Sequence, residues 1–190
     1  MSEFEYLSVL VSIVVAFALS EIFAGWGRMI RGRDHVKVYW VHIAATLLVA
    51  ALIIQFWWSA WQYHEMAINF YHYAALLLSP LTCVLLAFVL TPQITDGVKL
   101  DCRDYYYNNI RWMYPLAAVV IFELGLADYV IADGALATPK NLIRLIAICF
   151  ILLLAFNKKE FFHQAALGTL GLLLILFVSL NPILGGRGIQ

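Results

Sequence analysis

FYHYAALLLSPLTCVLLAFVLT, residues 70–91, contains no aspartate, glutamate, lysine or arginine. As an α-helix, a stretch of this length rises about 33 Å, which is enough to cross a hydrocarbon core of roughly 30 Å. Inside lipid the backbone N–H and C=O groups find no water, so a helix that bonds them internally is the expected structure. The stretch therefore predicts a transmembrane helix.

Five further stretches of the chain resemble it. Hydrophobic residues make up 64% of the sequence and charged residues 13%, a balance that indicates a membrane protein and not a soluble domain. The predicted spans cover residues 6–25, 38–62, 70–91, 113–132, 140–156 and 161–180. We therefore predict an all-α fold: a polytopic integral membrane bundle of six transmembrane helices in one domain, residues 1–190. Because the 140–156 stretch is short and contains Arg144, a five-span alternative stays open.

The basic residues between these spans predict the orientation of the chain. Nine of the twelve lie in connections on the same side of the membrane: Arg28, Arg31, Arg33, Lys37, Lys99, Arg103, Arg111, Lys158 and Lys159. Short loops rich in lysine and arginine stay in the cytoplasm. We therefore expect the longest connection, residues 93–112, to be cytoplasmic and both termini to be extracytoplasmic, in the plasma membrane of a prokaryote.

One short motif occurs twice. FYHYAAL at residues 70–76 returns as FFHQAAL at residues 161–167, with five of the seven positions identical. A three-span unit reverses its orientation in the next copy, so a repeat of residues 1–92 and 93–190 would be inverted. Inverted repeats recur in transporters and channels. The alternative is an asymmetric six-helix bundle without internal symmetry.

Three polar side chains are predicted at one depth near the cytoplasmic leaflet. They are Glu21 at the end of the first span, His42 at the start of the second and His163 at the start of the sixth. A carboxylate and two imidazoles are competent ligands for Zn²⁺ or Fe²⁺. A hydrogen bond between Glu21 and His42 that holds two helices together is the alternative interpretation, and we predict no cofactor.

A second set of polar side chains lies deeper in the predicted spans or near their outer ends. An ionisable residue at the centre of a bilayer costs about 2.5–3.5 kcal/mol on insertion scales, so it usually faces protein or water. Glu123 is predicted near the bilayer centre, either protonated or facing a wet cavity on a transport path. Asp128 and Arg144 are predicted at similar depth, as an ion pair or as part of that path. Gln55 is predicted to line an outer vestibule.

The 93–112 connection is the predicted contact surface for a cytosolic partner. Its candidate residues are Tyr105, Tyr106, Tyr107 and Arg111, although we favour a solvated connector as the interpretation of this segment. Twelve basic and twelve acidic residues leave the chain neutral, so no nucleic-acid partner is expected. Contacts with the lipid bilayer and with further copies of the chain are the remaining expected partners.

These patterns favour transport over catalysis. The sequence lacks a phosphate-binding P-loop, an H-E-x-x-H zinc motif and a G-x-S-x-G nucleophile elbow, so we expect no enzyme. The prediction is a carrier or channel for a proton, a small cation or a small polar solute. The alternatives are an accessory or sensor protein that docks a partner through residues 93–112, and a membrane-embedded metal or redox enzyme.

Overall fold

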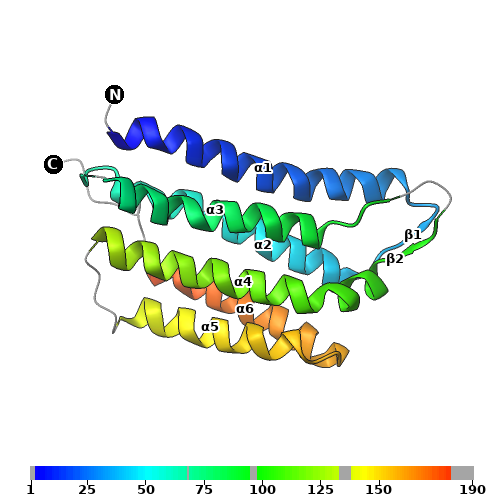
Figure 1. The fold of residues 1–190 in the computed structure, drawn as a ribbon. Helices are drawn as coiled ribbons and strands as arrows, with labels where there is room; N and C mark the ends of the chain where they lie inside the picture. The colour runs from blue at the N-terminus through cyan, green and yellow to red at the C-terminus, as the bar shows by residue number, and fades with distance from the viewer. Residues whose placement is uncertain (1–2, 68, 95–97, 133–137, 181–190) are drawn as a thin grey trace.

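The computed structural model of the protein describes residues 3–67, 69–94, 98–132 and 138–180, and these form a bundle of helices that run side by side (Figure 1). The bundle contains α1 (Glu3–Arg31), α2 (Trp40–Ala60), α3 (Phe70–Leu90), α4 (Cys102–Ala132), α5 (Pro139–Ala155) and α6 (Glu160–Leu180). A 3-10 turn, η1 (Trp61–Tyr63), extends α2, and two short strands, β1 (Val36–Lys37) and β2 (Leu100–Asp101), lie between helices. The predicted all-α fold with six helices is confirmed.

Four of these helices, α1 to α4, are long and apolar enough to cross a membrane. Helix α5 has 17 residues and rises about 26 Å, slightly less than the hydrocarbon thickness. Large apolar side chains point outward from the bundle, among them Phe17, Phe122 and Leu153, each more than 60% exposed. Such a surface is stable in contact with lipid chains and not with water, so the fold is that of a membrane-embedded protein.

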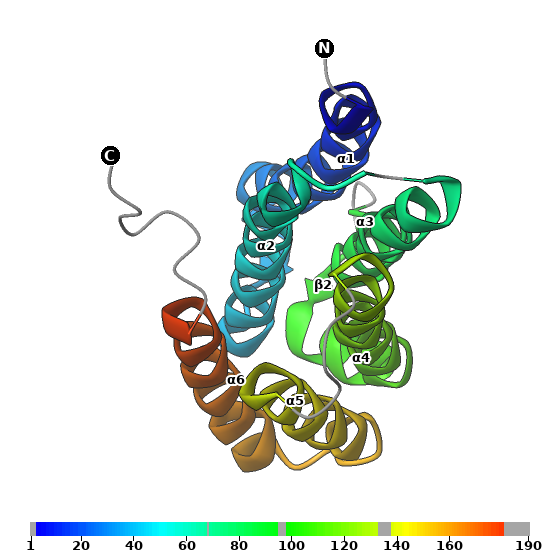
Figure 2. The ribbon, with the colours of Figure 1, turned by 90° about the vertical axis from the view of Figure 1, so that its left-hand side faces the viewer.

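The six helices form a closed ring. Going round it, α1 packs on α3, α3 on α4, α4 on α5, α5 on α6, α6 on α2, and α2 on α1. Figure 2, viewed along the helices, shows α2 on one side of the ring, α3 and α4 on the other, and α5 and α6 below. This arrangement does not show on which side of the membrane the termini lie. The inverted repeat also stays a prediction.

The structure differs from the sequence prediction in the 93–112 connection. Helix α4 already begins at Cys102, so the second half of the expected loop is the first three turns of this helix. The reason is tertiary burial: Tyr106 and Ile110, one turn apart, are both fully buried. Asp101 Oδ1 also accepts the backbone N–H of Arg103 at 2.9 Å, which satisfies a free donor at the start of the helix.

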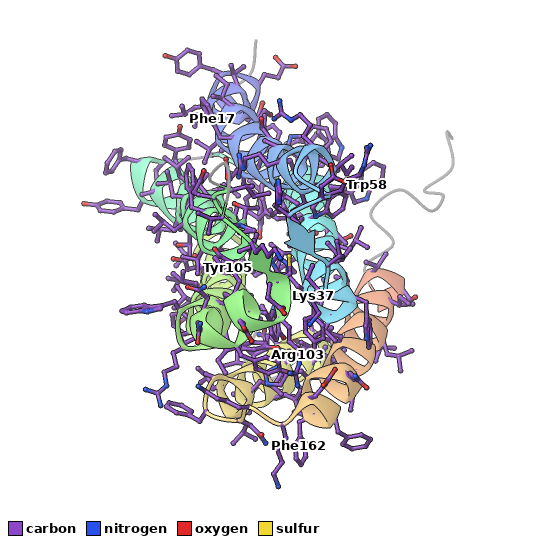
Figure 3. The ribbon with its side chains drawn as sticks, turned by 90° about the vertical axis from the view of Figure 1, so that its right-hand side faces the viewer. Phe17, Lys37, Trp58, Arg103, Tyr105 and Phe162 are labelled. Atoms are coloured by element: carbon purple, nitrogen blue, oxygen red, sulfur yellow. The ribbon has the colours of Figure 1, made fainter. Side chains whose placement is uncertain are left out.

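A two-strand clip joins the connections at one end of the bundle. Strands β1 and β2 pair in parallel, with Val36 opposite Leu100 and Lys37 opposite Asp101. The Lys37 ammonium donates to Asp101 Oδ2 at 3.0 Å. Figure 3 looks at this end of the molecule, where Lys37 and Arg103 are labelled. The clip ties the α1–α2 connection to the start of α4.

Candidate ligand cavity

The ring encloses a cavity of about 150 Å³ that is lined by every helix except α1. Its walls are mostly aliphatic side chains, including Leu48, Leu52, Ala117, Leu124, Ala147 and Leu170. The lining also contains polar groups, and these gather near the two ends of α4, around Tyr106 at its start and Asp128 at its finish. The cavity is therefore an apolar space with a cluster of polar residues at each end, one around Tyr106 and one around Asp128.

The polar group near the end of α4 is built around Asp128. Arg144 on α5 places its Nη2 atom 2.5 Å from Asp128 Oδ2, which is the ion pair expected from the sequence. On the other side, Gln62 Nε2 donates to Asp128 Oδ1 at 3.1 Å, and the Tyr63 hydroxyl donates to the same oxygen. The η1 turn extends α2 and directs both of these side chains inward. The Asp128 carboxylate of α4 therefore binds side chains from α5 and from η1.

The polar group near the start of α4 is a tyrosine and histidine cluster. The hydroxyls of Tyr106 and Tyr114 are 2.5 Å apart and lie 3.1 and 2.9 Å from His163 Nδ1. His163 Nε2 lies 2.5 Å from the backbone carbonyl oxygen of Asn157, which can only accept, so Nε2 carries the proton. The Nδ1 atom of a neutral imidazole then accepts from a tyrosine hydroxyl. All three side chains are buried.

The predicted inner-leaflet residues do not meet at one site. Glu21 Oε1 accepts from Arg28 Nη2 at 2.5 Å and from the Thr91 hydroxyl at 2.7 Å. His42 is fully buried and its Nε2 lies 2.7 Å from the carbonyl oxygen of Leu90.

Glu21 and His42 thus both hydrogen-bond to the end of α3, Glu21 to Thr91 and His42 to Leu90. His163 belongs to the tyrosine cluster. Within the described ranges, no group of three histidine, cysteine or acidic side chains is placed to hold a metal ion. The predicted metal site of Glu21, His42 and His163 is therefore not assembled. The direct Glu21–His42 hydrogen bond is not formed either, because each side chain has a different partner.

Three of the four predicted path residues line the cavity. Gln55, Asp128 and Arg144 all do, and Gln55 Nε2 donates to Ser59 one turn away at 2.9 Å. Glu123 is not part of the lining. It lies between α4 and α3, where the Thr82 hydroxyl donates to its Oε1 atom at 3.0 Å.

The residues that the sequence interpretation missed are tyrosines. Tyr106 and Tyr114 were assigned to a loop or to the edge of a span because the segment around them is polar. A helical signal was present: Tyr106, Ile110 and Met113 follow at spacings of four and three, the pattern of a buried helix face. Tyr63 came at the end of a span and carried no signal of its role, since η1 turns it inward only in the folded chain.

The predicted partner-docking residues are largely internal. Tyr106 is buried, the Tyr105 hydroxyl donates to the carbonyl of Val89 at 2.8 Å, and the Tyr107 hydroxyl lies 3.2 Å from that of Tyr39. Arg111 is exposed. A cytosolic partner stays a prediction, with Arg111 exposed and Tyr105 and Tyr107 half-buried.

The fold and the cavity together define a class, the helical membrane proteins with an internal cavity. Comparison with protein families, with curated proteins and with solved structures finds no match to this chain. Its function is therefore argued from its own residues.

Proposed function

We propose that the protein is a membrane-embedded carrier for a small amphipathic molecule, which it binds in the cavity inside the helix ring. The observation that supports this proposal is the extent of the lining. It includes Tyr106 and Asp128 on the same helix, 22 residues and so about 33 Å apart, close to the thickness of the hydrocarbon core. The lined space thus leads from near one membrane face toward the other.

The walls favour a ligand with an apolar body. An engineered, purely apolar cavity of about 150 Å³ in another protein stays dry and takes up benzene, so a space of this size suits a single ring or a short alkyl group. A bare ion in the aliphatic middle would lose its hydration without replacement, which costs far more than a neutral body. Among the predicted substrates, the small polar solute is favoured, provided that it carries an apolar body.

The two ends supply the polar contacts. At one end Asp128 and Arg144 present opposite charges side by side, which suits a ligand group with hydrogen-bond donors and acceptors. At the other end the hydroxyl protons of Tyr106 and Tyr114 are used within the cluster, but their oxygens can still accept from a ligand hydroxyl or amine. We further propose the plasma membrane of a prokaryote as the location, with the clip on the cytoplasmic side.

Binding is tested by titration calorimetry with aniline, a single-ring aromatic amine of the size that the cavity suits, added to the purified full chain in detergent. Ala45 lines the cavity, whereas Ala51, six residues on in α2, is exposed on the outside of the bundle. Ala45→Phe should fill part of the space and weaken binding about tenfold, equivalent to about 1.4 kcal/mol. Ala51→Phe should leave the affinity unchanged. Equal affinities for both variants would place the probe outside the cavity.

Transport is tested separately in proteoliposomes loaded with the same probe. Wild-type protein should release it faster than protein-free vesicles, after correction for its passive leak, and Ala45→Phe should remove most of this difference. Binding without any protein-dependent release would contradict the carrier and favour a receptor or sensor.

A further inference from the structure

Glu123 forms part of a second polar region, on the contact between α3 and α4. These two helices lie side by side along their length (Figures 1 and 2). Glu123 Oε1 accepts from Thr82, but Oε2 is buried and has no hydrogen-bond partner in the described part of the chain. A buried carboxylate oxygen without a donor is strongly unfavourable, so the side chain requires a further interaction.

Helix α3 carries a second buried oxygen that has no hydrogen-bond partner among the described residues. Ser79 is fully buried, and its Oγ atom also has no hydrogen-bond partner among the described residues. It lies one turn before Thr82, which bonds Glu123, and before Cys83, which is close enough to Glu123 to interact with its charge. Residues three and four apart share a helix face. Ser79 therefore lies on the face of α3 that meets Glu123.

A third oxygen comes from the helix backbone. Pro80 has no N–H, so the carbonyl of Leu76 lacks the donor that a regular helix would supply four residues later. Leu76 is buried and lies one turn before Ser79 on the same side of α3. The proline thus leaves a carbonyl oxygen without its helix donor, one turn from Ser79 along α3.

We propose that Glu123, Thr82, Ser79 and the Leu76 carbonyl form a binding site for a monovalent cation, with Na⁺ as its natural probe. The ligands are all oxygens, which hard cations prefer. One carboxylate balances one positive charge, whereas a divalent ion on the same carboxylate would leave a net charge in the membrane.

A proton alone satisfies these atoms less well. Ser79 Oγ and Glu123 Oε2 are not hydrogen-bonded to each other, so a proton on the carboxyl group leaves the Ser79 hydroxyl without a partner. A cation that bridges the two oxygens would satisfy both of them. A bound cation also neutralises the carboxylate, which a bridging water does not. The site is defined by its own residues and does not depend on the proposed carriage.

The test uses dicyclohexylcarbodiimide, a hydrophobic reagent that modifies protonated carboxyl groups in apolar surroundings. The purified full chain is treated at fixed pH in NaCl or in choline chloride of equal ionic strength, and modification of Glu123 is followed by peptide mass spectrometry. We expect Na⁺ to suppress the modification in a saturable manner, because a cation on the carboxylate excludes the proton that the reagent requires. Glu123→Gln identifies the modified position.

Two variants relate the Na⁺ effect to the proposed ligands. Ser79→Ala removes one ligand oxygen and should raise the Na⁺ concentration for half-protection about tenfold, as expected for a lost contact to a charged group. Thr169→Ala on α6, where the hydroxyl bonds only its own helix, should change nothing.

Three results would overturn the proposal. Modification that responds to pH but not to Na⁺ assigns a proton site, and modification that responds equally to both salts assigns an ionic-strength effect. Absence of modification in both salts, together with an unfolding temperature that does not change with Na⁺, shows a buried neutral carboxyl group. The wild-type Na⁺ titration decides the question even if Ser79→Ala folds poorly.

Discussion

Gly25 shows at the scale of a single residue how tightly α1 meets the end of α3. A Cβ atom at this position would lie 2.6 Å from Thr91 Cγ2 and 2.9 Å from Thr91 Cβ, distances that carbon atoms do not tolerate. The Thr91 hydroxyl is held by Glu21, so the side chain cannot easily turn away. Two residues further on, a Cβ at Gly27 would meet nothing within 4 Å. The two glycines therefore differ in their packing and not in their helical propensity.

The expected effects of alanine at these positions have opposite signs. Gly25→Ala should lower the free energy of unfolding by about 1–3 kcal/mol, because the new methyl group overpacks the contact. Gly27→Ala should leave it unchanged or raise it by up to about 1 kcal/mol, because alanine is the better helix former. Unfolding in mixed micelles measures both variants. Equal changes in the two would show that α1 and α3 are not in close contact.

The Asp128–Arg144 pair is the second prediction at this scale. Arg144→Gln leaves the Asp128 carboxylate with Gln62 and Tyr63 but without the cation, so we expect a loss of about 3 kcal/mol in the free energy of unfolding. Adding Asp128→Asn to this variant should restore part of the loss, because no uncompensated charge remains. Arg111→Gln, at an exposed position, serves as the control. No recovery in the double variant would indicate that packing and not charge is responsible.

At the scale of elements, the clip makes stability depend on pH. The hydrogen bond from Lys37 holds the pKa of Asp101 below its usual range, and the backbone N–H of Arg103 acts in the same direction. Because the folded-state pKa lies below that of the unfolded chain, the contact stabilises the clip above the ordinary aspartate pKa of about 3.9. That stabilisation is lost as the pH falls through this value toward the lower folded-state pKa.

Hydrogen exchange of residues 36–37 and 100–101 between pH 6 and pH 3 measures this dependence, after the intrinsic exchange rate is divided out. Protection should decrease at the acidic end in the wild type. Asp101→Asn should show lower protection throughout, with no further loss on acidification, whereas Asp104→Asn, an exposed carboxylate just inside α4, should behave as the wild type. A wild-type profile that stays flat to pH 3 would contradict the role given to Asp101.

At the scale of the whole molecule, the cavity and the proposed cation site share a wall. Leu76 and Leu124 both line the cavity, and each is adjacent to the second region, Leu76 through its own carbonyl and Leu124 as the neighbour of Glu123. A ligand in one place and a cation in the other therefore contact the same turns of α3 and α4. By linkage, any effect of the cation on ligand affinity must be matched by an equal effect of the ligand on cation affinity.

The expected outcome is that Na⁺ changes the affinity for aniline several-fold, within the range of about 5–150-fold usual for coupled sites. The measurement compares probe titrations in NaCl and in choline chloride for the wild type and for Glu123→Gln, and the variant should show no difference between the salts. This prediction rests on both proposals. If the probe affinity is the same in NaCl and in choline chloride for both proteins, the two sites are not coupled. Probe binding and protection by Na⁺ would then be independent properties.

The sequence by itself determined the class of the protein and the existence and approximate limits of its helices. This was possible because apolar length and composition are local properties, and lipid leaves helix as the main solution for such stretches. It also determined the Asp128–Arg144 pair, since two opposite charges at one depth in neighbouring spans are each costly alone.

Only the tertiary structure decided which polar residues meet. Glu21 and His42 were expected to share a site, yet each contacts a different residue at the end of α3. His163 joins Tyr106, which was read as part of a loop, and Tyr114, at the start of a predicted span. Depth along a helix follows from residue number, but the direction of a side chain round the helix and the identity of the facing helix depend on how the ring closes. That closure results from packing between distant segments, which no local pattern in the sequence records.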